Sequence, residues 1–164
     1  MGPYFIDFEG FQHGAGEYCL KELCIMSIDQ PLFPLYYLFE APRKWQDLHQ
    51  EEKVTYSYVT NNYHELDWDE GQTRYCSNCI MNHVQHHFPY WQNGIFYVME
   101  TQNNGPKYKF LKQEFPELNL VNYNITFNNL PTLPPNISCL HRNHGPHCAF
   151  LKCLKMVVHY TSFK

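Results

Sequence analysis

The stretch Pro3-Tyr4-Phe5-Ile6-Asp7-Phe8-Glu9-Gly10-Phe11 decides the fold, because its bulky apolar residues predict a strand that ends at the turn Gly14-Ala15-Gly16. A second strand is predicted over 18–28. Its two faces carry Leu20, Glu22, Cys24, Met26 and Ile28 on one side and Cys19, Lys21, Leu23 and Ile25 on the other. Pro31 and Pro34 separate it from a third strand over 35–39. Connections this short make the three strands antiparallel.

The remainder of the chain alternates helices and strands. We expect helix within 45–61 and 72–88, a strand over 94–100, a helix over 106–115, a strand over 118–123 and a last helix from 146 or 147 to 160. A crossover helix between the fourth and fifth strands makes those two parallel. The sequence therefore predicts an α/β fold with a five-stranded mixed sheet, three strands antiparallel and then two parallel, flanked by helices.

Length and composition restrict the class of protein. The chain has 164 residues, of which 44% are hydrophobic, so we expect one domain over 1–164, excised from a larger protein. No apolar run approaches the about 20 residues of a membrane span, so no membrane partner is expected. Seven cysteines are an odd number, and no export signal is evident, so we expect an intracellular protein, nuclear or cytoplasmic, in a reducing compartment.

Charge is distributed unevenly along the chain. The net charge is −4, but residues 1–104 hold 14 acidic and 5 basic side chains, whereas residues 105–164 hold 2 acidic and 7 basic ones. A basic last third indicates a surface for a phosphate backbone, and the alternative is an ordinary solvated helix surface. The candidate nucleic-acid-binding residues are Lys107, Tyr108, Lys109, Lys112 and Arg142.

Two carboxylates of the first strand are candidate catalytic residues. Asp7 and Glu9 are two residues apart, so strand alternation places them on one face. Such a pair can share Mg²⁺ or Mn²⁺ for phosphodiester hydrolysis, which uses two metals about 4 Å apart. The alternative is a half-exposed strand that carries two acidic residues.

This strand resembles the first strand of ribonuclease H-like exonucleases with an Asp-Glu-Asp-Asp-His active site. Those enzymes open their last helix with His-x-Ala-x-x-Asp, and here His147 and Ala149 match while Lys152 replaces the aspartate. The resemblance implies that His147 is a general base. The family's third carboxylate has no clean counterpart, and Glu65, Asp67 and Asp69 are the alternatives.

A second constellation is the run Cys139-Leu140-His141-Arg142-Asn143-His144-Gly145-Pro146-His147-Cys148. Thiolates and imidazoles are the ligands that zinc prefers, and four of them complete a tetrahedron. The loop residues Gly145 and Pro146 let such ligands converge. The run predicts a zinc site, and the alternative is a histidine-rich basic loop.

This run and Glu22 together resemble the Maelstrom domain, a ribonuclease H-like fold with a Glu-Cys-His-Cys zinc site. Similar domains are encoded by insect mobile elements and viruses. The resemblance implies a structural zinc ion held by Glu22, Cys139, His144 and Cys148, with His141 as the alternative histidine. Glu22 shares its predicted strand face with apolar residues, and a carboxylate buried among them needs a partner such as a zinc ion.

A third constellation places Cys76, Cys79, His83 and His86 on one face of a predicted helix. One straight helix cannot surround an ion with four ligands, so packing of this face beside Ile80 and Val84 is favoured over a metal site.

These features predict a domain that binds or processes nucleic acid, with single-stranded RNA favoured, and that holds a structural zinc ion. One alternative is an active metal-dependent nuclease that uses Asp7 and Glu9. The other is a catalytically dead module that binds protein partners.

Overall fold

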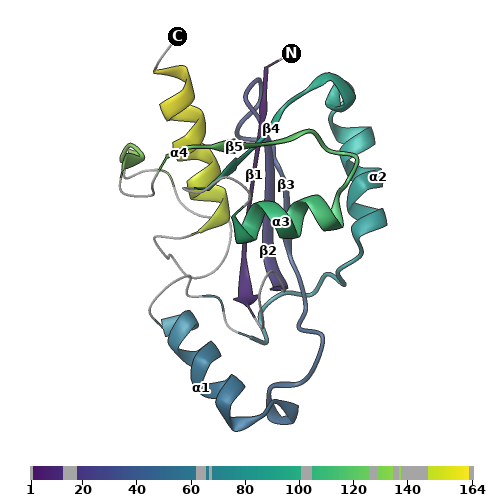
Figure 1. Cartoon of the computed structure of the whole chain (residues 1–164), viewed down its shortest axis with the longest axis vertical. Helices are drawn as coiled ribbons and strands as arrows, with labels where there is room; N and C mark the ends of the chain where they lie inside the picture. The colour runs from purple at the N-terminus through teal and green to yellow at the C-terminus, as the bar shows by residue number, and fades with distance from the viewer. Residues whose placement is uncertain are drawn as a thin grey trace.

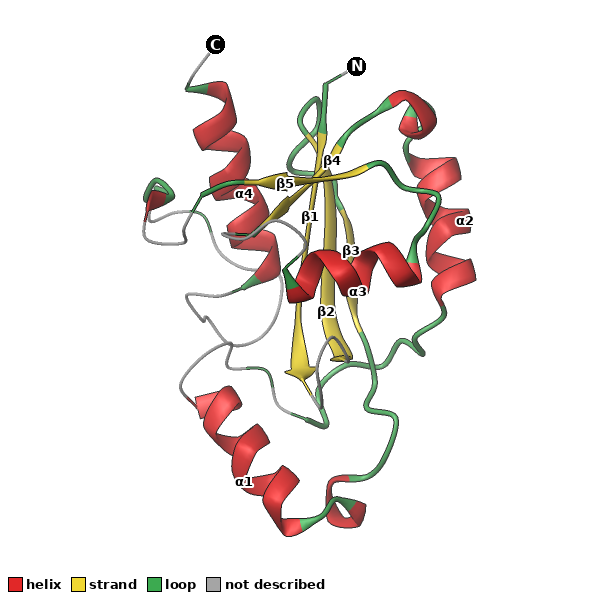
Figure 2. Ribbon diagram, in the orientation of Figure 1, coloured by secondary structure: helices red, strands yellow, loops and turns green. Residues whose placement is uncertain are grey.

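A computed structural model describes residues 2–12, 18–61, 66, 68–100, 105–125, 129–134, 137 and 148–162. Within these residues the structure is an α/β fold with a five-stranded mixed sheet, as the sequence predicts (Figures 1 and 2). The strands are β1 (Tyr4–Gln12), β2 (Tyr18–Ser27), β3 (Leu35–Leu38), β4 (Phe96–Met99) and β5 (Leu120–Tyr123). The α-helices are α1 (Gln50–Val59), α2 (Ser77–His87), α3 (Pro106–Glu114) and α4 (Ala149–Thr161).

The strand order is β3-β2-β1-β4-β5. The pairs β1–β2 and β2–β3 are antiparallel and β4–β5 is parallel, which confirms the predicted directions. β4 also pairs in parallel with β1 and joins the two groups of strands into one sheet. β1 is therefore central, and it is buried along most of its length.

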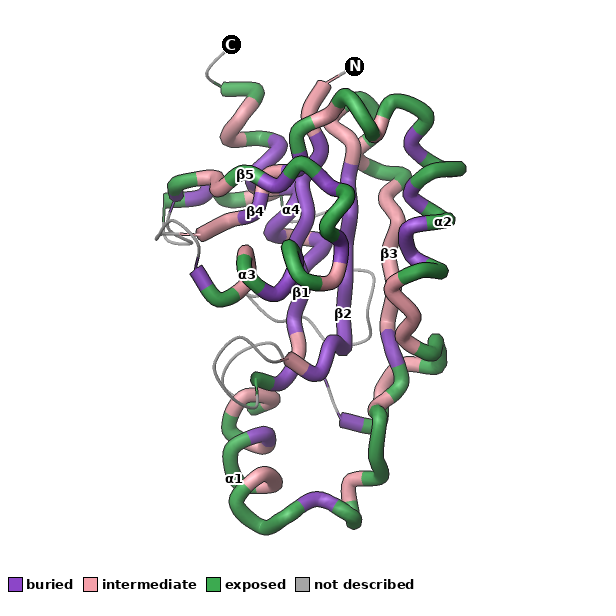
Figure 3. Tube along the Cα trace, turned by 45° about the vertical axis from the view of Figure 1, so that its right-hand side comes forward, coloured by how far each residue is buried: buried purple, intermediate pink, exposed green. Residues whose placement is uncertain are grey.

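Helices cover both faces of the sheet. α2 and α3 pack on one face, where Ile6 and Phe8 of β1 meet Val84 of α2 and Leu111 of α3. α4 packs on the other face, over Phe5 and Met26. The two layers lie on opposite sides of the sheet in Figure 1, and β1 and β2 are buried along most of their length in Figure 3.

A β-bulge interrupts the alternation of β2. Glu9 is opposite Glu22, but Gly10 is opposite Leu20, so Lys21 is the extra residue. Beyond the bulge the faces exchange, and Leu20 packs with Leu23 in the core that α2 and α3 cover. The prediction that Leu20 shares a face with Glu22 is therefore wrong, because one inserted residue reverses the side-chain direction.

The bulged residue, Lys21, has an ammonium group that is buried although no carboxylate is paired with it among the described residues. Its Nζ donates to the carbonyl oxygens of Phe39 (2.7 Å), Trp68 (2.8 Å) and Glu70. Burial lowers the pKa of Lys21. These bonds tie the segment before α2 to β2 and to the end of β3.

The helix boundaries differ from the predicted ones in the middle of the chain. The stretch 45–61 contains a short 3-10 helix, η1 (Trp45–Asp47), and then α1, because Leu48 and His49 between them are extended. α2 begins five residues later than 72, since Thr73 forms a bridge with Phe39. A further 3-10 helix, η3 (Trp91–Asn93), precedes β4.

α1 lies at one end of the sheet (Figure 1), where Tyr56 packs with Phe11 and Trp68. Among the helices that the structure describes, none has the length and apolarity to cross a membrane.

Candidate functional site

Asp7 and Glu9 lie side by side on the sheet face that α4 covers. The register places Asp7 opposite Cys24 and Glu9 opposite Glu22, so the pleat directs all four side chains to this face. The side chains of Asp7 and Glu9 are only 0% and 3% exposed. The sequence-based placement on one face is thus confirmed, but the two carboxylates are buried rather than half-exposed.

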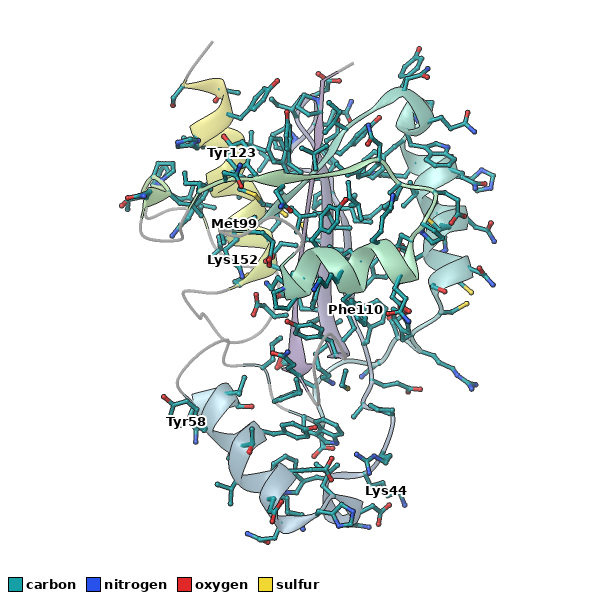
Figure 4. The ribbon with its side chains drawn as sticks, viewed as in Figure 1. Lys44, Tyr58, Met99, Phe110, Tyr123 and Lys152 are labelled. Carbon is teal, nitrogen blue, oxygen red and sulfur yellow. The ribbon has the colours of Figure 1, made fainter. Side chains whose placement is uncertain are left out.

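Two lysines contact both carboxylates. Lys107 of α3 places its Nζ 2.9 Å from Asp7 Oδ1 and 2.9 Å from Glu9 Oε2, and it also donates to the carbonyl of Phe8 at 2.7 Å. Lys152 of α4 places its Nζ 3.0 Å from Asp7 Oδ2 and also pairs with Glu9. Figure 4 labels Lys152 on α4. The four side chains form a neutral cluster, which we call the carboxylate–lysine tetrad.

The pKa values of the tetrad follow from its burial and its charges. Burial by itself raises the pKa of Glu9, but the ammonium groups of Lys107 and Lys152 outweigh it and lower that pKa to about 2. Burial lowers the pKa of each lysine, and the attraction of Asp7 and Glu9 reverses this, so both lysine pKa values are raised. Glu9, Lys107 and Lys152 therefore stay ionised at neutral pH, as a buried ion cluster requires.

The tetrad does not fit a divalent metal ion. Lys107 Nζ is equally distant from one oxygen of each carboxylate, so it occupies the point where a shared cation would bind. A Mg²⁺ or Mn²⁺ ion would have to displace at least one ammonium group and would leave it buried without its counter-charge. We therefore derive no hydrolytic step at Asp7 and Glu9. The third residue of the catalytic hypothesis, His147, lies outside the described residues.

Glu22 and Cys148 meet beside the tetrad, at the N-terminus of α4. Cys148 Sγ donates to Glu22 Oε2 at 3.6 Å, and the backbone N–H of Ala149 donates to Glu22 Oε1 at 2.8 Å. The hydroxyl of Tyr36 donates to Glu22 Oε2 at 2.5 Å. The carboxylate of Glu22 is thus held against the positive end of the helix dipole.

These two residues fit a zinc ion. Both are fully buried, and burial raises the pKa of Glu22 to about 7, so its carboxylate gains from a bound cation. With Zn–S near 2.3 Å and Zn–O near 2.0 Å, a tetrahedral ion separates a sulfur ligand from an oxygen ligand by about 3.5 Å, close to the distance seen here. Cys139, His141 and His144, the other predicted ligands, lie outside the described residues.

The predicted nucleic-acid-binding residues separate into inward and outward groups. Lys107 points into the tetrad and is only 18% exposed, so its charge is already neutralised. Tyr108 packs partly against the core, whereas Lys109 and Lys112 of α3 are exposed. Arg142 lies outside the described residues. The surface of residues 105–164 is therefore less positive than the composition suggests, because Lys107 and Lys152 form ion pairs with Asp7 and Glu9 in the interior.

Two histidines of α2 contact the segment that contains β3 and the residues before it. His83 Nδ1 lies 2.7 Å from the hydroxyl of Tyr37, and His87 Nε2 lies 2.9 Å from the carbonyl of Phe33. Ile80 and Val84 are buried. Within the part of the chain that the structure describes, no group of three His, Cys, Asp or Glu side chains is arranged to hold a metal ion. The preference for packing on this face agrees with these contacts.

Sequence reasoning missed the roles of Lys21, Lys107 and Lys152. One signal was available for Lys152, since it stands in the run Ala149-Phe150-Leu151-Lys152-Cys153-Leu154, where a lysine among apolar residues indicates a buried counter-charge. No comparable signal marks Lys107, which lies between Pro106 and Tyr108 at the start of a short helix.

Comparison of the chain with protein-family descriptions, curated proteins and solved structures gives no match.

Proposed function

We propose that this chain is a ribonuclease H-like domain of the Maelstrom type that binds single-stranded RNA without hydrolysing it and that holds one structural zinc ion. The carboxylate–lysine tetrad carries the proposal. Its two ammonium groups neutralise Asp7 and Glu9, so the position that a metal-dependent nuclease needs for its cations is filled by the chain itself.

The sheet supports the ribonuclease H-like assignment. Three antiparallel strands precede two parallel ones, and the last helix packs on the face that carries Asp7 and Glu9. The replacement of the family's aspartate by Lys152 agrees with a domain that has kept the fold and lost the metals.

The contact of Glu22 with Cys148 supports the zinc site. A zinc ion held by Glu22, Cys139, His144 and Cys148, with His141 as the alternative, would join β2 to the start of α4. When bound, it would act as a structural cross-link. Glu22 already orients toward that position through its bonds with Tyr36 and Ala149.

The exposed lysines of α3 support RNA as the ligand. Lys109 and Lys112 carry charge on the surface beside the partly buried Tyr108. A phosphate backbone is attracted to such a helix, and nearby aromatic side chains can stack on unpaired bases.

Zinc content and RNA binding test the proposal separately. Elemental analysis of the purified chain should give about one zinc per chain. We expect Cys139→Ser to lose that zinc and Cys76→Ser to keep it, since Cys76 lies on α2, away from Glu22. A zinc-free protein that folds normally would refute the metal site.

Binding of a labelled single-stranded RNA at several salt concentrations should show a steep salt dependence. Lys109→Gln with Lys112→Gln should weaken binding and reduce the slope of log affinity against log salt by about 0.7 for each lost phosphate contact. Lys44→Gln is the matched control, because Lys44 is exposed near α1 and far from α3 (Figure 4). Equal effects of the control and the α3 variants would contradict the assigned surface.

The same RNA, incubated with Mg²⁺ or Mn²⁺, should remain intact. Cleavage that disappears in the variant Asp7→Asn with Glu9→Gln would show that the site is an active nuclease. Absence of any affinity for RNA would instead favour a protein-binding module.

A further inference from the structure

Two cysteines lie together at the start of α2, far from the tetrad in the fold. Cys76 is the N-cap residue of the helix, and its Sγ accepts a hydrogen bond from the backbone N–H of Cys79 at 3.2 Å. The extended backbone of Cys76 (φ −154°, ψ 109°) brings its sulfur over the first helical turn, toward Cys79. The chain turn at the helix start brings Cα atoms three residues apart within about 7 Å, and a disulfide spans Cα separations of about 4.4–6.8 Å.

These are the accessible thiols among the described cysteines. Cys79 is exposed and Cys76 is half-buried, and both are free. The other described cysteines are buried: Cys19, Cys24, Cys148 and Cys153. Burial raises the pKa of Cys19 to about 11, which makes it a poor nucleophile at neutral pH.

The surroundings of the two thiols are different. A hydrogen bond from the Cys79 side chain, together with backbone N–H groups of Cys79 and Asn78 and the charge of Arg74, lowers the pKa of Cys76. The same thiol–thiol contact raises the pKa of Cys79. Cys76 therefore loses its proton more readily than Cys79, which suits it to attack first in thiol–disulfide exchange.

We propose that Cys76 and Cys79 form a redox-active dithiol that exchanges with low-molecular-weight disulfides of the glutathione type. The Cys76 thiolate attacks one sulfur of the small disulfide, its S–S bond breaks, and one small thiolate leaves and takes up a proton. Cys79 then loses its proton and attacks the Cys76 sulfur of the mixed disulfide, which releases the second small thiol. The dithiol is oxidised by two electrons, and the small disulfide is reduced to two thiols.

A metal site at this position is the competing explanation, and the contacts argue against it. The histidine one turn after Cys79, His83, has its Nδ1 engaged by the hydroxyl of Tyr37 and its ring stacked on that of Tyr37. No third ligand joins the two sulfurs within the described residues.

The experiment treats the reduced, folded full-length chain with glutathione disulfide, blocks remaining thiols and digests with trypsin. Cleavage after Arg74 and Lys107 releases fragment 75–107, whose only cysteines are Cys76 and Cys79. We expect this fragment to lose two hydrogens and to carry no blocking group. The buried Cys19, Cys24 and Cys153 are internal controls and should remain reduced.

Two variants separate the roles of the cysteines. Cys79→Ser should trap one glutathione on Cys76, while Cys76→Ser should react much more slowly, and serine keeps the N-cap so the helix still forms. Alkylation of Cys76 in Cys79→Ser should fall less than tenfold from pH 8.5 to pH 7, whereas an ordinary thiol with a pKa of about 8.5 loses roughly tenfold or more.

Glutathione on both cysteines without ring closure would overturn the proposal. So would a zinc ion whose binding is lost in Cys76→Ser, since that result would make the pair a metal site. The zinc measurement of the proposed function uses Cys76→Ser only as its control, and the RNA measurement involves neither cysteine. Loss of zinc in Cys139→Ser alone therefore tests the proposed function, and the disulfide in fragment 75–107 tests the dithiol.

Discussion

Replacing Lys152 with methionine removes one of the two ammonium groups that neutralise Asp7 and Glu9. Methionine fits the same volume without charge, so the carboxylates keep their packing and lose half of their counter-charge. The side chains of Lys152, Asp7 and Glu9 are 1%, 0% and 3% exposed, so solvent cannot replace the lost ammonium group. The variant buries a net negative charge.

The magnitude follows from the pKa of Glu9 and from the usual cost of breaking a buried ion pair. The pKa of Glu9 is lowered from 4.5 to about 2. At 1.36 kcal/mol per pKa unit, this difference corresponds to about 3 kcal/mol of native-state stabilisation at neutral pH. Removal of one partner from a buried ion pair typically costs about 3–5 kcal/mol. We therefore expect Lys152→Met to reduce the free energy of unfolding by about 3–5 kcal/mol, which corresponds to a midpoint roughly 10 °C lower for a chain of this size.

The pH dependence provides a second signature. A carboxyl group whose pKa is lower in the folded state stabilises the protein above its unfolded pKa, and this stabilisation is lost as pH falls through the folded pKa. In the wild type, the contribution of Glu9 is therefore complete above about pH 4.5 and lost toward pH 2. In Lys152→Met the carboxyl binds a proton more readily. The difference between the two proteins should then shrink as pH falls below 4.5.

Urea unfolding followed by circular dichroism at pH 7 and pH 4 measures both effects. Lys109→Met is the matched control, because Lys109 is exposed on α3, and it should change stability by less than about 0.5 kcal/mol. The double variant Glu9→Gln with Lys152→Met should recover part of the loss, since it removes the unpaired charge. The electrostatic reasoning would be refuted if Lys152→Met lowered the free energy of unfolding no more than Lys109→Met does. It would also be refuted if the double variant were no more stable than Lys152→Met.

Three further changes test other parts of the structure. Glu22→Gln should abolish the stabilisation that zinc gives the wild type, about 2.7 kcal/mol when free zinc is one hundred times its dissociation constant. Thermal unfolding with and without a chelator measures this stabilisation, and an equal effect of zinc on both proteins would exclude Glu22 as a ligand. Lys21→Met should lower the free energy of unfolding by about 3 kcal/mol and accelerate amide hydrogen exchange around Trp68, because three carbonyl oxygens lose their donor. Unchanged exchange around Trp68 would contradict the role of Lys21. Gly10→Ala should lower the free energy of unfolding, measured in urea, by at least about 2 kcal/mol, because an added Cβ would overlap the backbone carbonyl oxygen of Cys19 across the bulge. An unchanged free energy of unfolding would show that the bulge can shift.

Local patterns predicted the elements of the fold well. The apolar run 3–11 and the pattern of 18–28 gave two strands whose ends differ from the observed ones by one residue at most. Pro106 marked the start of α3 correctly, because its fixed φ suits the first helical position. The β-bulge at Lys21 could not be predicted, because it depends on the pairing of β2 with β1 and leaves no period in the sequence.

The site was predictable only in part. Sequence alone placed Asp7 beside Glu9 on one face, and the resemblance paired Glu22 with Cys148, which the structure brings within 3.6 Å. The zinc site itself remains a prediction, since its other ligands lie outside the described residues.

What the sequence determined by itself was the set of strands and helices and the chemistry available on each, because periodicity and turn residues act over a few positions. What only the tertiary structure decided was the partner of each charge. Lys107 and Lys152 are about one hundred residues or more from Asp7 and Glu9 in the chain, and they meet them because α3 and α4 converge on the end of β1. Burial there makes an unpaired carboxylate costly, so the fold pairs the acidic first strand with two lysines of the basic last third.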